Sequence, residues 1–339
     1  MPGKLADIAR QAGVSEATVS RVLNGKPGIS DTTRAAVLTA LDVIGYERPT
    51  HLRGRKARMV GLVVPELQNP IFPALAEVVA GALAQRGFNA VLCTRTGSMS
   101  EAEYVEMLLE RQVSGMIFAG GQYAEADAPH DHYTRLLQLR LPVVLVNAAA
   151  DHLDFPRVST DDAVAMQQAY SHLAYLGHEQ IGLIIGPPDH VPSRRKLKAF
   201  EAICLKAGGS AELVERTRFS LEGGHSAGAK LIERGATGII CASDPLALGA
   251  VRAARRSGLD VPGDLSVVGY DDSPLMACTE PPLTTVRQPI EAIGRAAVEL
   301  LAGQIEGSSI APEELYFEPE IVARGSTASA PLRAVLSQV

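Results

Sequence analysis

One short segment, residues 16–21, carries side chains that could contact the edges of DNA bases. An Arg can donate two hydrogen bonds to guanine, a Glu can accept from the amine of cytosine, and an Ala methyl can touch the methyl of thymine. In a helix through this segment, the apolar residues Val19, Val22 and Leu23 fall on one side. The other side, which could enter a major groove, carries Glu16, Ala17, Thr18, Ser20 and Arg21.

Three short helices are predicted to position this segment. The first ends at Gly13, a residue suited to the left-handed backbone of a helix end, and its apolar stripe is Leu5, Ile8, Ala9 and Ala12. The second follows Ser15, whose hydroxyl can accept a hydrogen bond from a first-turn amide. The third follows Ser30, stops at Gly45 and has the stripe Ala35, Leu38, Leu41 and Ile44. About 45 residues in three short helices is the size of a helix-turn-helix module.

The charge of the chain is divided unevenly. Residues 1–58 contain ten Lys or Arg against five Asp or Glu, whereas the whole chain of 339 residues contains 32 against 38. A basic head on an acidic body indicates that only the head approaches a polyanion. Charge alone is equally compatible with a solvated basic arm, so the DNA-binding interpretation depends on the helical pattern as well.

The composition disfavours membrane, secreted and metal-binding classes. No stretch approaches the ~18 apolar residues of a membrane span, and Lys4, Asp7 and Arg10 interrupt the apolar core that a signal peptide needs. We therefore expect a cytoplasmic, nucleoid-associated protein. The cysteines form neither a CxxC pair nor a Cys/His metal spacing. We expect no cofactor, and we expect Cys93, Cys204, Cys241 and Cys278 to be reduced thiols that lie mostly in the core.

From residue 59 onwards, short β-branched runs alternate with amphipathic stretches, which is typical of parallel sheets covered by helices. The predicted strands are 59–64, 90–93, 115–120, 143–147, 181–186, 238–243 and 265–272. The predicted helices include 73–85, 101–111, 163–176, 193–206 and 246–257. Because the alternation restarts near residue 160, we predict two doubly wound α/β lobes with a cleft at the carboxyl ends of their strands.

Polar and aromatic residues in these lobes could bind a polyhydroxy ligand in that cleft. Asp271 can accept from two hydroxyls, while Lys196 and Gln288 can donate to others. Phe72 and Phe219 offer apolar faces for sugar rings. The other candidates are Ile71, Asn147, His190, Ser243 and Asp244. Two carboxylates also have structural interpretations, since Asp271 could cap amides of its own GYDDS segment and Asp244, standing before a Pro, is expected to cap a helix.

Motifs in both parts of the chain resemble the LacI family of bacterial transcription regulators. The head has GVSEATVSRVLNG and a later GY. The body has PELQNPIF, HLAYLGHEQIGLI, CASDPLALGAVRAARRSGLDVPGDLSVVGYDD and PPLTTVRQP, so the resemblance covers nearly the whole chain. It implies a DNA-binding head, a hinge, and a body similar to a periplasmic sugar-binding protein whose chain crosses between the lobes three times. Lys4 and Leu5 replace the usual Thr cap of the first helix.

The resemblance also implies individual DNA contacts. Glu16, Ala17 and Arg21 would face base edges, and phosphates would be held by Thr18, Ser20, Asn24, Thr33 and Arg34. In the linker, Leu52 matches the leucine that family members insert into a central base step, and Arg53 and Arg55 would contribute the contacts that offset unstacking. The linker is a few residues shorter than usual, so a partly exposed leucine is the alternative for Leu52.

The domain organisation follows from the same resemblance. We expect a helix-turn-helix domain over 1–46, a hinge over 47–58, an effector-binding and dimerisation domain over 59–325, and a flexible tail over 326–339. Lobe 1 would comprise about 59–159 and 288–318, and lobe 2 about 160–287 and 319–325.

Within the family, the chain most resembles the maltose-type repressors of high-GC bacteria. The similar stretches are PELQNPIFPALAEVV, VPSRRKLKAF, CASD and DDSPLMACTEPPLTTVR, and Arg outnumbers Lys by 25 to 7, as that coding background favours. Lys196 departs from the Arg that the family commonly has, and an ammonium cannot reproduce a planar bidentate fork. The expected effector is maltose or a malto-oligosaccharide.

We therefore expect a sequence-specific repressor of carbohydrate-utilisation genes that a sugar releases from a palindromic operator. A homodimer would place two heads about 34 Å apart, and the tail is too short for the several heptads of a tetramerising coil. A regulator with a protein or small-molecule corepressor, and a stand-alone sugar-binding receptor, are the alternatives. We do not expect an enzyme, because the sequence has no Walker loop and no HExxH helix and we expect no nucleophile elbow.

Overall fold

A computed structural model describes residues 2–24, 26, 28–44, 58–95, 99–147 and 149–331. The chain divides into two compact units, Met1–Arg58 and Met59–Val339, which we call the head and the body. Among the described residues, no helix is both long enough and apolar enough to cross a membrane. Three of the cysteines are buried in the body, and Cys278 is exposed.

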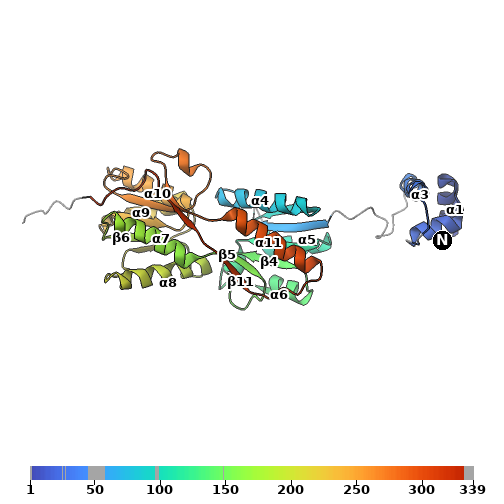
Figure 1. The fold of residues 1–339 in the computed structure, drawn as a ribbon, viewed down its shortest axis with the longest axis horizontal. Coiled ribbons are helices and arrows are strands. Elements are labelled where there is room, and N and C mark those ends of the chain that lie inside the picture. Colours follow the sequence, from blue (N-terminus) through green and yellow to red (C-terminus); the bar gives the residue numbers. More distant parts are fainter. Residues whose placement is uncertain are drawn as a thin grey trace, which may run out of the picture. The chain divides into compact units, whose positions relative to one another are not determined.

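The described part of the head consists of three helices, α1 (Pro2–Ala12), α2 (Glu16–Leu23) and α3 (Asp31–Val43) (Figure 1). Gly13 has φ +64° and ends α1. The hydroxyls of Ser15 and Ser30 cap α2 and α3, accepting from the amides of Thr18 and Thr33 at 3.2 Å each. Both caps agree with the sequence prediction. The core of the head is Ile8, Ala9, Val19, Val22, Val37, Ala40 and Leu41.

The predicted apolar stripe of α3 is confirmed at Leu41 and at Leu38, which packs against the core of the head, and is wrong at Ala35 and Ile44. Val37 and Ala40 are buried together with Leu41, whereas Ala35 is exposed and Ile44 is 38% exposed. Residues 35–38 are all apolar, so periodicity does not choose between two faces of this helix. Packing against α1 and α2 makes the choice.

Within the described residues of the body, the strands form two six-stranded sheets. Sheet 1 has the order β11-β5-β4-β3-β1-β2, from β1 (Arg58–Val64), β2 (Phe88–Thr94), β3 (Gly115–Ala119), β4 (Val143–Val146), β5 (Arg157–Thr160) and β11 (Glu314–Phe317). Sheet 2 has the order β12-β10-β9-β8-β6-β7, from β6 (Ile181–Ile185), β7 (Val214–Arg216), β8 (Gly238–Cys241), β9 (Ser266–Asp271), β10 (Thr284–Arg287) and β12 (Glu320–Val322). Strand β12 runs antiparallel to β10, whereas β8, β9 and β10 run parallel to their neighbours.

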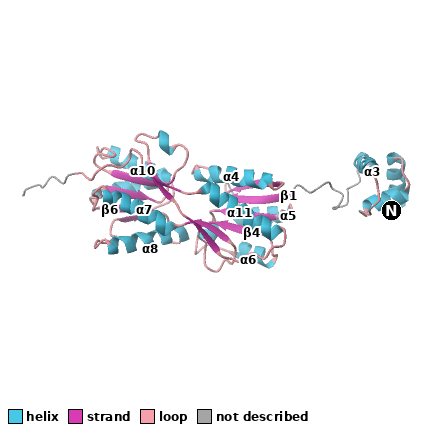
Figure 2. Cartoon of the chain, viewed as in Figure 1, coloured by secondary structure: helices cyan, strands magenta, loops and turns pink. Residues whose placement is uncertain are grey.

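Helices cover the sheets, as Figure 2 shows. Lobe 1 contains α4 (Ile71–Gln85), α5 (Glu101–Glu110), η1 (Gln122–Ala124), α6 (Asp131–Gln138) and α11 (Ile290–Ile305). Its two cores show that α4 and α11 pack on one face of sheet 1 and α5 and α6 on the other. Lobe 2 contains α7 (Asp162–Tyr175), α8 (Val191–Lys206), α9 (Leu221–Glu233), α10 (Asp244–Arg256) and η2 (Met276–Cys278). The predicted two-lobed α/β fold with parallel sheets is confirmed.

The described chain passes between the lobes at three places, after β5, after β10 and after β11. Strands β5 and β11 are neighbours in sheet 1, and β10 and β12 are neighbours in sheet 2. All three crossovers therefore lie at the same edge of each sheet. A relative motion of the lobes must bend the chain at this edge.

The predicted start of a flexible tail at residue 326 is wrong. Ser326 is fully buried, donates to the Val267 carbonyl at 2.6 Å and accepts from the Thr284 amide at 2.8 Å. The Ala328 amide donates to the Ser266 hydroxyl at 3.0 Å. This Ser- and Ala-rich segment has no apolar period to announce a packed element, and polar contacts attach it to lobe 2 instead. Residues 332–339 lie outside the described residues.

Candidate functional site

A cavity of about 810 Å³ lies between the two lobes of the body. This volume is toward the upper end of the ~300–1,000 Å³ found for small-molecule sites. The structure brings nine of the ten candidate effector residues together at its wall, namely Ile71, Phe72, Asn147, His190, Lys196, Phe219, Ser243, Asp271 and Gln288. Two of them, Asn147 and Asp271, end strands with φ values of 72° and 120°. Strained backbone of this kind is concentrated at functional sites.

Asp271 is held from both sides of the cavity. Its Oδ1 accepts from Gln288 Nε2 at 2.7 Å, and its Oδ2 accepts from Asn69 Nδ2 of lobe 1 at 3.2 Å. The residue is only 5% exposed. Burial, together with the neighbouring Asp244 carboxylate, raises the pKa of the Asp271 carboxyl well above its usual range. Each oxygen already has one protein donor, so ligand hydroxyls would have to share this carboxyl.

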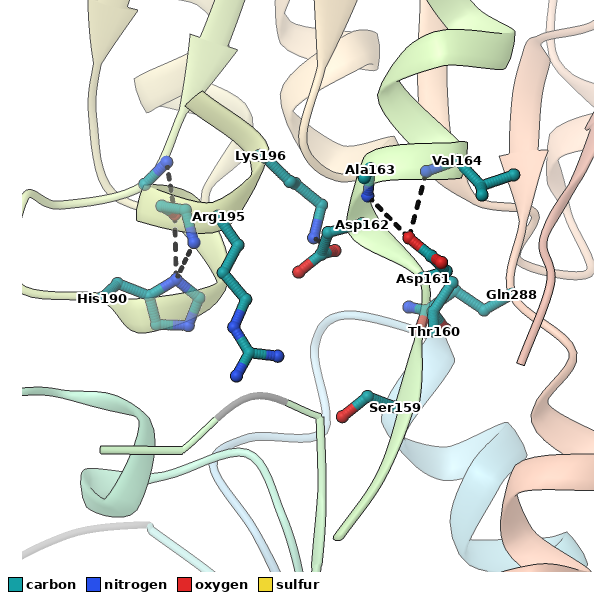
Figure 3. A network of polar contacts seen from close by, with 12 residues as sticks. Ser159, Thr160, Asp161, Asp162, Ala163, Val164, His190, Arg195, Lys196 and Gln288 are labelled. Carbon is teal, nitrogen blue, oxygen red and sulfur yellow. Dashed lines mark hydrogen bonds and ion pairs between the residues drawn. The ribbon is translucent and has the colours of Figure 1, made fainter. Parts of the chain in front are cut away.

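The contacts of Asp271 extend to the crossovers. Gln288, which follows β10 at the second crossover, accepts a hydrogen bond at Oε1 from the Thr160 hydroxyl at 2.8 Å. Thr160 ends β5 at the first crossover, and Figure 3 shows the two side chains beside each other. On the lobe 1 side, the Ile71 amide donates to Asn69 Oδ1 at 3.3 Å, which directs the Asn69 amine toward Asp271. A buried chain of hydrogen bonds therefore joins two crossovers to the start of α4.

Lys196 lies within the site but has partners of its own. Its Nζ forms an ion pair with Asp162, the first residue of α7, and lies 4.2 Å from the ring centroid of Tyr270. Figure 3 shows the Lys196 amine against the Asp162 carboxylate. Only part of its donor capacity is left for a ligand, unlike the Arg fork that the family commonly has here.

His190 caps α8 from the cavity wall. Its Nδ1 accepts from the Ser193 amide at 3.3 Å and lies 2.9 Å from the Ser193 hydroxyl. Burial and the nearby Lys196 charge lower the pKa of the imidazole to about 3. His190 is thus neutral at physiological pH, and its proton is on Nε2, which leaves one hydrogen-bond donor for a ligand.

Asp244 is the candidate that the structure does not bring to the cavity wall. It is fully buried and accepts from the Ser273 amide and the Thr285 hydroxyl, each at 2.7 Å. Its predicted capping role is also wrong, because Ser243 is the N-cap of α10 and accepts from the Leu246 amide. The Asp244 side chain turns away from the helix and joins α10 to the loop after β9 and to β10.

Several residues of the cavity wall were not found by sequence reasoning, including Asn69, Asp162 and Tyr270. Asn69 stands in PELQNPIF, where a single Asn after a strand does not by itself indicate a ligand contact. Asp162 follows a crossover, where a first-turn acid on a helix is common enough to attract no notice. Tyr270 precedes Asp271 within β9, and the alternation of side chains along a strand gives no reason to expect both at one cavity.

Residues 224–228, GHSAG, have the GxSxG spacing of a nucleophile elbow, contrary to our expectation. In an elbow, the Ser stands on the turn between strand and helix. Here all five residues lie inside α9, and a Cβ on Gly224 or Gly228 would come within 2.2 Å or 2.9 Å of α10 backbone atoms. These glycines permit close helix packing. The described residues also contain no group of three or more His, Cys, Asp or Glu suited to a metal ion.

The candidate DNA contacts of the head lie on and beside α2. Val19 and Val22 are buried, while Glu16, Ala17 and Arg21 are exposed. The side-chain Nδ2 of Asn24 donates to the Ser20 carbonyl at 2.8 Å, and Thr33 Oγ1 accepts from Ser30 Oγ at 2.8 Å. Thr18, Ser20 and Arg34 are half-buried. Leu52, Arg53 and Arg55 lie outside the described residues.

A three-helix head of this kind joined to a two-lobed body defines the class of bacterial regulators with a ligand-binding body. Residues 4–49 match the bacterial regulatory proteins of the lacI family, and residues 170–327 match the periplasmic binding protein-like domain. The chain belongs to the LacI family.

Its relatives include regulators from several bacteria. The chain is 53% identical over 338 residues to the HTH-type transcriptional regulator MalR of Streptomyces coelicolor, covering 98% of each chain. It is 33% identical to the transcriptional regulator CelR in its cellobiose complex, with a TM-score of 0.72 and coverage of 95% and 99%. It is 26% identical to the lac repressor dimer bound to operator and the anti-inducer ONPF, with a TM-score of 0.75 and coverage of 95% and 98%.

Proposed function

We propose that this protein is a homodimeric repressor of carbohydrate-utilisation genes that binds a palindromic operator and is released by maltose or a malto-oligosaccharide. The interlobe cavity supports the proposal most strongly, because amides, carboxylates and aromatic rings from both lobes surround it in a chain with a helix-turn-helix head. The relatives MalR and CelR, the latter in complex with the glucose disaccharide cellobiose, favour a gluco-oligosaccharide.

In this proposal, Glu16, Ala17 and Arg21 meet base edges, and the polar residues around them meet phosphates. The sugar favours a closed arrangement of the lobes and thereby changes the distance between the two heads. A 100-fold preference of the sugar for the released state corresponds to about 2.7 kcal/mol of coupling.

The test is a fluorescence-anisotropy titration of labelled DNA from upstream of the protein's own gene, with and without maltotriose. We expect tight binding that maltotriose reverses. Arg21→Ala should abolish operator binding and leave sugar binding intact, while the exposed Arg252→Ala in the body should change neither.

Failure to bind any such fragment would contradict the proposal that the protein is a DNA-binding regulator. Operator binding that no maltodextrin reverses would contradict only the proposed effector.

A further inference from the structure

The strand order of the two sheets gives the cavity two ends. The crossovers follow β5, β10 and β11 at one edge of the sheets, whereas β2 and β7 form the opposite edges. The end nearer the crossovers, the inner end, is lined by Asn69, Asp162, Lys196, Tyr270, Asp271 and Gln288. The other end, the outer end, lies where Glu125 and His190 form an isolated β-bridge between the lobes. It is lined by Glu66, Arg95, Glu125, Asp189, His190, Arg218 and Phe219.

Charged groups at the inner end already have partners within the protein. Both oxygens of Asp271 accept hydrogen bonds from amides. Lys196 and Asp162 form an ion pair. A ligand at this end competes with protein groups for each of these side chains.

Charged groups at the outer end are far less engaged. Among the described residues, the Arg218 side chain has no hydrogen bond or ion pair, and the Glu66 and Asp189 carboxylates accept no hydrogen bond. Arg95 Nη1 is 3.9 Å from Glu125 Oε1, beyond hydrogen-bond distance. Burial raises the pKa of the Glu66 carboxyl, and the charge of Arg95 offsets only part of this effect. These groups have hydrogen-bonding capacity to offer to a ligand.

An aromatic ring is fixed among these groups. The Phe219 ring lies with its centroid 5.1 Å from that of His190, at an interplanar angle of 67°. Gly186, which follows β6, leaves the space for it, because a Cβ there would come within 2.4 Å of Phe219 Cε2. The ring is therefore held in one place by neighbours, as a stacking surface for a sugar requires.

The charges of the outer end indicate a neutral ligand. Glu66, Glu125 and Asp189 supply three carboxylates against the two guanidiniums of Arg95 and Arg218. A phosphate would meet more negative than positive groups there. Hydroxyl groups, which both donate and accept, can use both signs of charge.

We infer that the outer end is a second sugar subsite, in which the later rings of a gluco-oligosaccharide stack on Phe219 and accept hydrogen bonds from Arg218 and Arg95. The inference rests on the proposed function and adds selectivity for length. A single glucose ring occupies the inner end alone. Two or more rings also contact the outer end, where Arg95 comes from lobe 1 and Arg218 from lobe 2.

The test is calorimetric titration of the full-length protein with glucose, maltose and maltotriose, comparing the wild type with Arg218→Ala, Arg95→Ala and the double variant. The exposed Arg252→Ala is the matched control. A hydrogen bond to a charged group is worth enough to change affinity by about tenfold. We expect Arg218→Ala to weaken the affinity for maltotriose by about that factor and to leave the affinity for glucose unchanged.

The outcomes separate the two claims. A wild type that binds none of these sugars overturns the proposed effector, and the subsite with it. Sugars that bind without dependence on length, or an Arg218→Ala variant that weakens glucose and maltotriose equally, overturn only the subsite. Tighter binding of glucose 6-phosphate than of maltose would contradict the inference that the outer end binds a neutral ligand. Equal melting temperatures of the variants confirm that folding is unaffected.

Discussion

Asp244 is a carboxylate whose contacts are all internal, and this leads to the first prediction. Asp244→Ala leaves the buried Ser273 amide and the Thr285 hydroxyl without their acceptor. We expect the free energy of unfolding to fall by about 1–3 kcal/mol, with little change in the sugar affinity of the folded protein. Urea denaturation measures the first quantity and calorimetry the second. Asp127→Ala, at an exposed carboxylate, should lie within about 0.5 kcal/mol of the wild type.

His190 gives a prediction on pH. Because burial lowers its pKa to about 3 in the folded protein, its unfolded form takes up a proton near the ordinary value of 6.5 while the folded form does not. The stability that it contributes is therefore complete above pH 6.5 and falls as the pH decreases toward 3. This loss approaches about 1.4 kcal/mol per pH unit. His190→Asn retains an N-cap and should make the stability curve shallower between pH 6 and pH 4.5, as measured by urea denaturation. An unchanged slope would contradict the assigned pKa.

At this scale, sequence reasoning found residues but not their partners. Strand ends identified Asn147 and Asp271 because the carboxyl ends of parallel strands meet at one edge. Nothing in the sequence shows that Asn69, distant by 202 positions, donates to Asp271. Nor does it show that Asp162 accepts from Lys196, because that contact depends on how α7 packs against α8 within lobe 2.

Among the elements, α9 shows why a helix can escape a sequence prediction. Its segment LEGGHSAGAKLIE contains three glycines, which disfavour an isolated helix by up to about 1 kcal/mol each relative to Ala. Gly224 and Gly228 are needed because α10 backbone atoms lie within 3 Å of where their Cβ atoms would be. Tertiary packing thus overrides the local preference. The seven predicted strands, by contrast, are short and largely apolar, and all seven occur.

A pair of elements on opposite sides of the crossovers gives the third prediction. Arg195 of α8 donates to both oxygens of Glu314 of β11, at 2.6 Å and 3.0 Å, and thereby joins lobe 2 to lobe 1. Ser159 also donates to Glu314 at 2.6 Å. Figure 3 shows the side chains of Arg195 and Ser159. A bidentate, partly buried pair is expected to contribute about 1 kcal/mol to the joined arrangement. Arg195→Ala should weaken sugar affinity about fivefold by lowering the population of that arrangement.

The control for this pair is its neighbour on α8. Arg194 is exposed, so Arg194→Ala should leave sugar affinity unchanged. A double-mutant cycle of Arg195→Ala and Glu314→Ala, read by calorimetric sugar titration, isolates the coupling. A coupling energy of zero would show that the pair does not govern how the lobes meet.

At the scale of the whole molecule, the division into two compact units leads to a prediction about how sugar binding in the body is coupled to operator binding by the head. The body has its own extensive cores in both lobes, so residues 59–339 alone should bind sugar with the affinity of the DNA-free full chain. If sugar lowers operator affinity by some factor, operator must lower sugar affinity by the same factor, because the two are linked through one cycle. Titrating sugar into the full chain with saturating operator should therefore show that reduction, and the isolated body should show none when the same DNA is added. An isolated body that fails to bind a sugar bound by the full chain would mean that the sugar binds at the head and that release occurs by competition there, not through the cleft.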